Sequence, residues 1–397
     1  MIVQVPKISP LTKVLPDEPL LMMGAGPVPI PSSVSWANSI VINHLGETMA
    51  TIVHQVKAMA RYVFQTESKW VLGVAGPGSA AMEMAVANMI WPGEKVLSVC
   101  NGFFSERLAE MARRSGGEVV TYQAPEKHCA DLDAVKQAII EHQPKVLTIV
   151  QGETSHTVFN RFLPEIAAFA QDNNCQVIVD AVCTLSTMPL SMDDWGIDAV
   201  ITGGQKGLSS IPGVSLIGFS ENAWQRINSR PCQQTHWCLD ATLAKNFWHD
   251  ASYHYTAPVS GLLALHEALR LICDETLEAR FARHLRCSHA LQKGIEAMGL
   301  SLYASEASRL NSVIGICLPD DVKPGQICKH ISEHYRVEIS GSFGPNIVRI
   351  GQMGEQSREH HLFRALHAFG ATMRDFGLPM DIPNGMAELE KHLQVKA

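Results

Sequence analysis

Short runs of valine, isoleucine and leucine alternate with amphipathic segments over the first two thirds of the chain. Continuous apolar runs predict buried strands, and apolar residues that recur every three or four positions predict helices. We expect strands at 95–99, 118–122, 145–150, 176–179, 199–202 and 214–219, and helices at 105–115, 131–141 and 163–173. Ser105 is the expected N-cap of the first of these helices. Strands this apolar are typical of a sheet covered on both faces, so the pattern predicts an α/β fold with a mostly parallel sheet.

The pattern changes after about residue 260. Longer helices are expected at 262–273, 277–298 and 363–375, with short strands at 313–318 and 336–339. The first 20 residues are rich in proline and aperiodic, which indicates an arm that lies on a partner subunit. We therefore divide the chain into an N-terminal arm at 1–20, a large domain at 21–275 and a smaller α+β domain at 276–397.

Two charged residues follow apolar runs that are predicted to be strands. Asp180 ends one run, and Lys206 follows another within Gly203-Gly204-Gln205-Lys206. Lysine is rarely buried without a functional reason, and parallel sheets bind their ligands at the carboxyl ends of strands. A lysine that forms a Schiff base with pyridoxal phosphate fits this place, as does an acid that keeps the pyridine nitrogen protonated. The alternative is a surface lysine in a glycine-rich turn and an aspartate that closes a strand.

Composition narrows the classes of function. The chain is 46% hydrophobic and 18% charged, which is typical of a soluble globular protein. Its net charge is −7 and its basic residues are scattered, so no nucleic-acid partner is expected. No apolar stretch approaches the roughly 20 residues of a membrane span, and the first residues do not resemble a signal peptide. We expect a cytoplasmic protein that does not contact a membrane.

The cysteines favour a reducing compartment and no metal site. Ten cysteines are spread along the chain without a CxxC pair, as expected for reduced thiols in the cytoplasm. Cys232 and Cys238 flank His236, but this spacing matches no zinc pattern.

Further segments suit an anionic ligand. Gly76-Pro77-Gly78-Ser79 precedes a predicted helix, whose free N–H groups and dipole favour a phosphate; the alternative is an ordinary strand–helix turn. Arg349 lies between apolar residues, where its planar fork suits a substrate carboxylate or, alternatively, a surface ion pair. The hydroxyls of 153–157 and 253–258 are placed to bind a cofactor, or to cap and pack loops.

Taken in order, these segments resemble one family, the class V aminotransferases, which are pyridoxal-phosphate enzymes of fold type I. The resemblance extends from Gly24 to Gly354 and points to the alanine–glyoxylate and serine–pyruvate branch. The motifs that carry it are Val179-Asp180-Ala181-Val182, Gly204-Gln205-Lys206, Asn101-Gly102 with Arg107, and Arg349-Ile350-Gly351-Gln352-Met353-Gly354. It implies a seven-stranded, mostly parallel sheet, a smaller C-terminal domain, and a homodimer with shared active sites.

The resemblance also implies a role for individual residues. Lys206 and Asp180 match the catalytic residues, the Schiff-base lysine and the acid on the pyridine nitrogen. The other residues that match cofactor-binding positions are Gly78, Ser79 and Gln205 at the phosphate, Val182 and Phe104 on the two ring faces, Thr154 beside a cofactor oxygen, and Tyr253 and Thr256 from the neighbouring subunit. The substrate-binding residues are Arg349 at the carboxylate, with Gly26, Thr154 and His156 in the pocket.

The chain departs from the family pattern at several places, among which Gly203-Gly204 and Ser209-Ser210-Ile211 are slightly unusual. Pro77 stands where relatives usually carry a small or hydroxyl residue, and His156-Thr157 replaces Thr-Gly. We expect amino transfer from a small amino acid of the alanine or serine type to a 2-oxo acid, glyoxylate or pyruvate. The alternatives are a relative that uses ureidoglycine, 2-aminoethylphosphonate, or pyridoxamine with pyruvate; a lyase or desulfurase; and a relative without catalytic activity.

Overall fold

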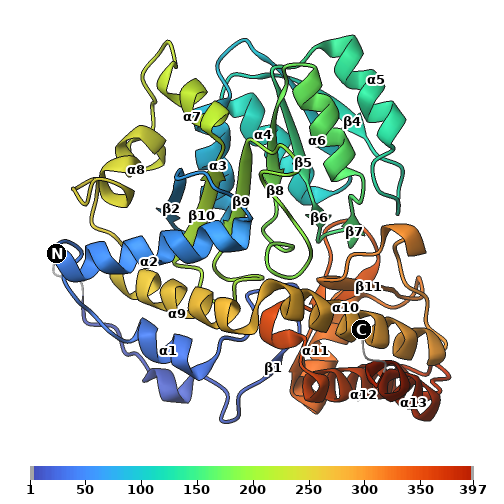
Figure 1. Ribbon diagram of the computed structural model, residues 1–397. Helices are drawn as coiled ribbons and strands as arrows, with labels where there is room; N and C mark the ends of the chain where they lie inside the picture. Colours follow the sequence, from blue (N-terminus) through green and yellow to red (C-terminus); the bar gives the residue numbers. More distant parts are fainter. Residues whose placement is uncertain (1–3, 395–397) are drawn as a thin grey trace.

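The computed structural model describes residues 4–394. Its centre is a seven-stranded sheet in the order β2-β10-β9-β8-β5-β3-β4 (Figure 1). Strand β10 runs antiparallel to both of its neighbours, and the other pairs are parallel. The strands are β2 (Val71–Ala75), β3 (Lys95–Cys100), β4 (Glu118–Gln123), β5 (Val146–Val150), β8 (Gln176–Asp180), β9 (Ala199–Gly203) and β10 (Val214–Phe219).

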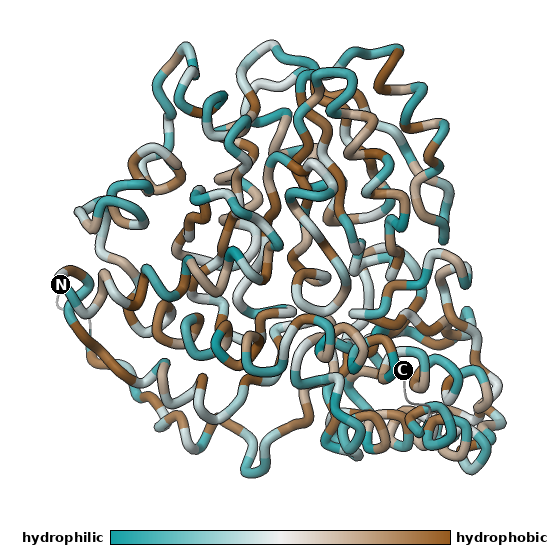
Figure 2. The backbone as a smooth tube through the Cα atoms, in the orientation of Figure 1, coloured by the Kyte–Doolittle hydropathy of each residue, from teal (hydrophilic) through white to brown (hydrophobic). Residues whose placement is uncertain are grey.

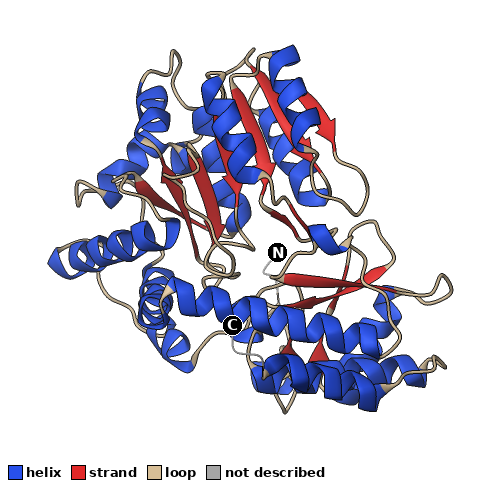
Figure 3. Cartoon of the chain, turned by 45° about the vertical axis from the view of Figure 1, so that its right-hand side comes forward, coloured by secondary structure: helices blue, strands red, loops and turns tan. Residues whose placement is uncertain are grey.

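Helices cover both faces of this sheet, as Figure 3 shows. Because both faces are covered, β5, β9 and β10 are buried along their whole length, which explains their continuous apolar sequences. Figure 2 shows these strands largely in the colours of hydrophobic residues. The helices of this part are α1 (Ser32–Asn38), α2 (Glu47–Phe64), α3 (Gly78–Met89), α4 (Phe103–Arg114), α5 (Leu132–His142), α6 (Leu163–Asp172), α7 (Glu221–Asn228), α8 (Ala241–Trp248) and α9 (Val259–Glu275). The short strands β6 (Gly152–Glu153) and β7 (Val158–Phe159) form a hairpin beyond β5.

The C-terminal part has its own hydrophobic core, which includes Leu291, Ile350 and Phe369. Its elements are α10 (Leu277–Ala297), β11 (Val313–Cys317), α11 (Pro324–Tyr335), β12 (Val337–Glu338), β13 (Ser340–Gly341), β14 (Ile347–Gly351), α12 (Glu359–Asp375) and α13 (Ile382–Leu393). The N-terminal strand β1 (Leu21–Met22) pairs with β12, so the chain crosses this part before it enters the large sheet. The division at 275/276 stays a prediction; β1 packs with the C-terminal core.

A buried arginine joins the two parts behind the sheet. The side chain of Arg280 on α10 is 3% exposed and forms an ion pair with Glu275 at 2.9 Å. Its guanidinium also donates to the carbonyl oxygens of Gly207 and Ser186 at 2.7 and 3.1 Å. Gly207 directly follows Lys206, so the C-terminal part helps to hold the lysine loop in place.

The expected strands and helices are all present, with ends that differ by at most four residues. The expectation that Ser105 is an N-cap is wrong: Gly102 is the N-cap of α4. Ser105 lies three residues inside the helix, where its hydroxyl accepts from the backbone N–H groups of Asn101 and Gly102 at 3.0 and 3.1 Å. The arm at 4–20 is exposed apart from the partly buried Leu20, with one 3₁₀ turn at Leu11–Lys13, and residues 1–3 lie outside the described part. None of the helices within 4–394 is long and apolar enough to cross a membrane.

Candidate active site

The carboxyl ends of β8 and β9 bring Asp180 and Lys206 to one cavity. Parallel pairing places Asp180 opposite Ile201, and Lys206 follows in the turn after β9. The cavity has a volume of about 190 Å³. It is lined by Gly78, Ser79, Met82, Phe104, Arg107, Val150, Gly152, Thr154, Asp180, Val182, Cys183, Gln205 and Lys206. Eight of the residues predicted for the site therefore meet in one place.

Asp180 is a carboxyl group held out of water. It is 4% exposed, and its Oδ1 accepts from the backbone N–H of Val182 at 2.8 Å. Burial raises the pKa of Asp180 to about 7, since desolvation disfavours the charged form more than this hydrogen bond favours it. A cationic partner in the cavity would stabilise the carboxylate.

Lys206 is held against the N-terminal segment of the chain. Its Nζ donates to the carbonyl oxygen of Ala25. A Cβ at Gly26 would lie 2.5 Å from Nζ, and the backbone of Gly26 has a φ of +99°, so this position requires glycine. Burial lowers the pKa of Lys206 to about 8, so the neutral amine forms more readily near physiological pH than it does for an ordinary lysine.

The start of α3 presents hydrogen-bond donors to the same cavity. Gly78 and Ser79 are its first two residues, and within residues 4–394 their backbone N–H groups have no acceptor. Gln205 is 8% exposed, and its Oε1 has no hydrogen-bond partner in the described chain. Because buried polar atoms are normally paired, these free groups indicate a missing polar ligand. The helix dipole favours an anion at this place.

Two apolar side chains line the cavity beside the charged groups. Val182 packs so closely on Gly78 that a Cβ there would lie 2.9 Å from the valine Cγ2. Phe104 comes from the first turn of α4, next to Phe103 at a ring-centroid distance of 5.5 Å. Val182 and Phe104 are placed to line a flat ring.

Glu153 fixes the position of Phe104. Its fully buried carboxylate accepts from the backbone N–H groups of Phe104 and Ser105 at 3.1 and 2.9 Å. It also accepts from the Ser155 hydroxyl at 2.6 Å. Glu153 therefore joins the start of α4 to the segment that carries Thr154, and both of these contribute residues to the cavity.

Arg349 on β14 is held by two backbone carbonyls, one from the C-terminal part and one from the segment after β6. Its Nε donates to Gly341 and its Nη1 to Thr154, both at 2.8 Å. It is 5% exposed, and burial lowers its pKa to about 10. No acidic side chain within 4–394 lies within 4.0 Å of its nitrogens, so its remaining donors are free for a carboxylate.

Five predicted residues are not among those that line the cavity of their own chain. Two of them, Gly26 and Arg349, have the contacts described above, and the other three are His156, Tyr253 and Thr256. His156 lies under Gly102, and its Nδ1 is 2.9 Å from the Ser155 hydroxyl. Tyr253 and Thr256 are exposed. Their roles stay predictions.

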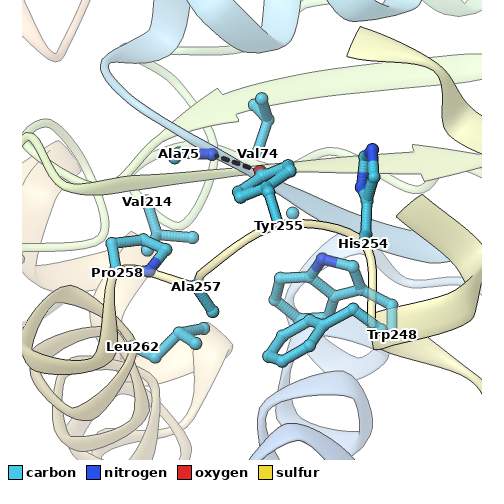
Figure 4. Close-up of a pocket in the computed structure, with 11 residues that line it drawn as sticks. Val74, Ala75, Val214, Trp248, His254, Tyr255, Ala257, Pro258 and Leu262 are labelled. Atoms are coloured by element: carbon cyan, nitrogen blue, oxygen red, sulfur yellow. Dashed lines mark hydrogen bonds between the residues drawn. The ribbon is translucent and has the colours of Figure 1, made fainter. Parts of the chain in front are cut away.

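A smaller cavity next to that exposed segment is not a second site. It lies between β2, β10 and residues 254–258, as Figure 4 shows. Its volume of about 20 Å³ holds about one water molecule, and its walls are mainly apolar. The Tyr255 hydroxyl accepts from the Ala75 N–H there at 3.2 Å, which pins the segment to the sheet edge.

No metal centre is found in the described part of the chain. Residues 4–394 contain no group of three or more histidine, cysteine, aspartate or glutamate side chains arranged to hold an ion. Cys232 and Cys238 are exposed, free thiols.

Some residues of the site had no role that could be assigned from the sequence. Arg107 was recognised only as part of a motif, although it lines the cavity one turn after Phe104; that spacing was a usable signal. Phe343 had no signal in the sequence. It is 52% exposed, its ring stacks on that of Phe103 at a centroid distance of 4.5 Å, and the Arg349 guanidinium lies 5.9 Å from its centroid.

The buried carboxyl predicts a stabilising substitution. Above pH 7 Asp180 is ionised in the folded and unfolded chains, so the folded state carries the full cost of desolvation; below about pH 4 it is protonated in both and this cost disappears. In ligand-free protein, Asp180→Asn should raise the free energy of unfolding by roughly 2–4 kcal/mol at pH 8, and by less at pH 5. Urea unfolding at both pH values measures this. If the variant is no more stable than the wild type at pH 8, the buried Asp180 carboxylate does not carry the cost of desolvation described above.

The chain is similar to known proteins over most of its length. The family described as Aminotransferase class-V matches residues 34–362. Alanine–glyoxylate aminotransferase of Oryctolagus cuniculus is 32% identical over 364 residues, which cover 89% of this chain and 92% of the relative.

Two solved structures share the fold closely. Ureidoglycine–glyoxylate aminotransferase from Bacillus subtilis has a TM-score of 0.93 at 28% identity, covering 96% of this chain and 100% of that chain. Pyridoxamine–pyruvate aminotransferase from Mesorhizobium loti has a TM-score of 0.91 at 25% identity, with the same coverage of 96% and 100%. Three findings point to the same family: the topology of the sheet, the meeting of Lys206 and Asp180 in one cavity, and the match to the family model. The chain belongs to the class V aminotransferases and is an enzyme that transfers amino groups.

Proposed function

We propose that this aminotransferase binds pyridoxal 5'-phosphate at Lys206 and moves an amino group from a small amino acid to glyoxylate or pyruvate. The observation that carries the proposal is the meeting of Lys206 and Asp180 in one buried cavity at the carboxyl ends of β8 and β9. A structural lysine and aspartate in a dry interior would pair directly, whereas here Lys206 donates to Ala25 and Asp180 accepts from Val182.

The cavity fits this cofactor at each of its chemical groups. The N–H groups that start α3 and the NH2 group of the Gln205 side chain suit the phosphate. Asp180 suits the protonated pyridine nitrogen, whose charge would compensate the buried carboxylate. Val182 and Phe104 suit the two faces of the ring, and Thr154 lies in the same wall for a ring oxygen.

When bound, pyridoxal phosphate supplies an electron sink for the pair left when the Cα–H bond of the substrate breaks. The residues of this chain supply the rest. Lys206, with its lowered pKa, takes the proton from Cα and returns a proton as general acid. The carboxylate of Asp180 would hold the ring nitrogen in its protonated form, and that positive charge would in turn favour the ionised carboxylate. The backbone carbonyls of Thr154 and Gly341 hold Arg349 ready for the carboxylate.

The names of the relatives support glyoxylate as the acceptor, because alanine–glyoxylate and ureidoglycine–glyoxylate aminotransferases are both similar to this chain. A small amino acid of the alanine or serine type is the proposed donor. Gly26 lies against the Lys206 side chain, so that a Cβ there would be 2.5 Å from Nζ, and the Phe343 ring lies 5.9 Å from the Arg349 guanidinium.

A desulfurase function has less support. It needs a mobile, reactive cysteine in the C-terminal part, but Cys317 lies in β11 and Cys328 in α11, both partly buried. Burial raises the pKa of both thiols, which lowers their reactivity.

A panel of amino donors tests the proposal. Each donor is mixed with the cofactor-loaded protein without an acceptor, and the visible absorption is followed through this half-reaction. Alanine or serine should convert the cofactor fastest, glyoxylate or pyruvate should restore it, and Lys206→Ala should not respond. Conversion by ureidoglycine, 2-aminoethylphosphonate or pyridoxamine alone would replace the proposed donor, and release of sulfur or another elimination product would replace the reaction class.

Arg349→Lys should not preserve activity. An ammonium group cannot reproduce the planar fork between the two carbonyls, so kcat/KM should fall by the equivalent of about 2–5 kcal/mol. The loss should affect amino acids and oxo acids alike, while the absorption of the bound cofactor stays unchanged. Arg286 forms an ion pair with Glu359 at 3.0 Å, away from the cavity. Arg286→Lys is the control and should keep activity. Full activity of Arg349→Lys would place the carboxylate elsewhere.

We also propose a homodimer in which each site is completed by the neighbour. Tyr253 and Thr256 lie on the surface of the described chain, and the exposed arm carries Val5, Ile8 and Leu11. Exposed apolar groups of this kind favour a protein partner, and a second copy would place the two hydroxyls at a phosphate. We further propose a cytoplasmic location, since all ten cysteines are free.

Mixing two inactive variants tests the shared site. Lys206→Ala and the double variant Tyr253→Phe/Thr256→Ala should each fail on their own, the second through weaker cofactor retention. A heterodimer combines the intact lysine of one subunit with the intact hydroxyls of the other, so mixing should restore one site of two. Exchanged subunits that gain neither cofactor nor activity, or a protein that sediments as a monomer, would contradict the proposal.

A further inference from the structure

Arg107 brings to the cavity a positive charge that has no ion-pair partner within residues 4–394. It lies on α4 one turn after Phe104 and lines the cavity together with Ser79. Its Nη1 donates to the Ser79 hydroxyl at 3.1 Å. Within residues 4–394 no carboxylate oxygen lies within 4.0 Å of its guanidinium, unlike most of the arginines on this molecule. A half-buried cation without a counterion points to an anionic ligand.

The anion-binding end of the cavity is where Arg107 points. Ser79 is the second residue of α3, and the backbone N–H groups of Gly78 and Ser79 are free in the described chain. Gln205, more than nine tenths buried, also lacks a partner for Oε1 and lines the same cavity. These groups line one cavity, so the free N–H groups, the NH2 group of the Gln205 side chain and the guanidinium can donate to one ligand.

The residue before α3 offers no hydrogen-bond donor to an anion that binds at the start of this helix. Pro77 is the N-cap of α3 and makes no side-chain cap hydrogen bond. It has neither a hydroxyl nor an N–H to offer a ligand. A phosphate monoester carries a charge of about −1.5 to −2 near neutral pH, whereas a helix N-terminus offers about +0.5. Hydrogen bonds from the α3 backbone alone therefore leave most of this charge unbalanced.

We propose that Arg107 binds the phosphate group of the cofactor and supplies the charge that Pro77 and the α3 N-terminus do not. This inference rests on the proposed function, because it assumes the same cavity and cofactor. Its consequence concerns the substrate. A site with a dedicated phosphate cation retains a phosphorylated cofactor, so free pyridoxamine is not the amino donor of this enzyme.

The rival explanation is that Arg107 only supports Phe104. Its guanidinium lies 5.0 Å from the centroid of the Phe104 ring and 4.9 Å from that of Phe103, within the range of a cation–π contact. A supporting role would affect the ring of the cofactor. A phosphate role would affect only ligands that carry a phosphate, so the two explanations are separable by ligand chemistry.

The test compares two ligands that differ by the phosphate. Full-length protein freed of its cofactor is titrated with pyridoxal phosphate and with pyridoxal, and the dissociation constants are measured by absorption or equilibrium dialysis. Arg107→Gln should weaken pyridoxal phosphate binding by about 10- to 100-fold, the effect of losing a hydrogen bond to a charged group, and leave pyridoxal binding unchanged. Arg107→Lys should retain part of the affinity. Arg113→Gln, an exposed arginine on the same helix, is the control and should change neither constant.

Equal weakening of both ligands would overturn the proposal in favour of support for Phe104, and unchanged binding of both would overturn it outright. Inorganic phosphate gives a second measurement that needs no bound cofactor and no activity. It should raise the melting temperature of the ligand-free wild type and compete with pyridoxal phosphate, but do neither in Arg107→Gln. If Arg107→Gln does not fold, the wild type, Arg107→Lys and the phosphate competition decide the question: an absence of competition in the wild type contradicts the proposal. A wild type that binds no pyridoxal phosphate at all would instead show that the proposed function has failed.

Discussion

The structure depends on a carboxylate and an amine that are buried in one cavity without neutralising each other. Parallel pairing of β8 with β9 places Asp180 and the Lys206 turn at the same edge of the sheet. Burial raises the pKa of the carboxyl to about 7 and lowers that of the amine to about 8, so each group lies near the point where it changes charge. Groups poised in this way are costly to a folded protein and are typical of catalytic sites.

The surrounding contacts hold this pair in place from both parts of the chain. Arg280 of the C-terminal part binds the carbonyl of Gly207 just after the lysine, and the N-terminal segment meets Lys206 through Ala25. Arg349 is held between a carbonyl of the large sheet's loops and one of the C-terminal strands. A substrate carboxylate at Arg349 would therefore lie at the junction of both parts.

The sequence predicted the strands and the catalytic pair because both have local signals. Continuous apolar runs mark strands such as β5 and β9, and a charged residue at the end of such a run marks a site. The position of Ser105 was not predictable in this way. Its hydroxyl and the Glu153 carboxylate both bind the start of α4, and Glu153 lies in β6, 48 residues away in the sequence. The antiparallel direction of β10 also depends on chain topology rather than on its own residues.

Residues of the site that act through distant partners were the hardest to foresee. The two carbonyls that hold Arg349 come from segments far apart in the sequence, and no residue pattern marks them. Phe343 lies in a short loop of glycines and serine, where its stacking on Phe103 arises only from the packing of the two parts. Arg107 had a helical spacing to Phe104, but its lack of a counterion becomes evident only in three dimensions.

The most direct test of the account is the identity of the residue that carries the cofactor. The purified protein, saturated with pyridoxal phosphate, is reduced with borohydride, digested and analysed by mass spectrometry. We predict one modified peptide, with the pyridoxyl group on Lys206. The single variant Lys206→Ala should not show this modification. A modification on another lysine, or none on the wild type, would contradict it.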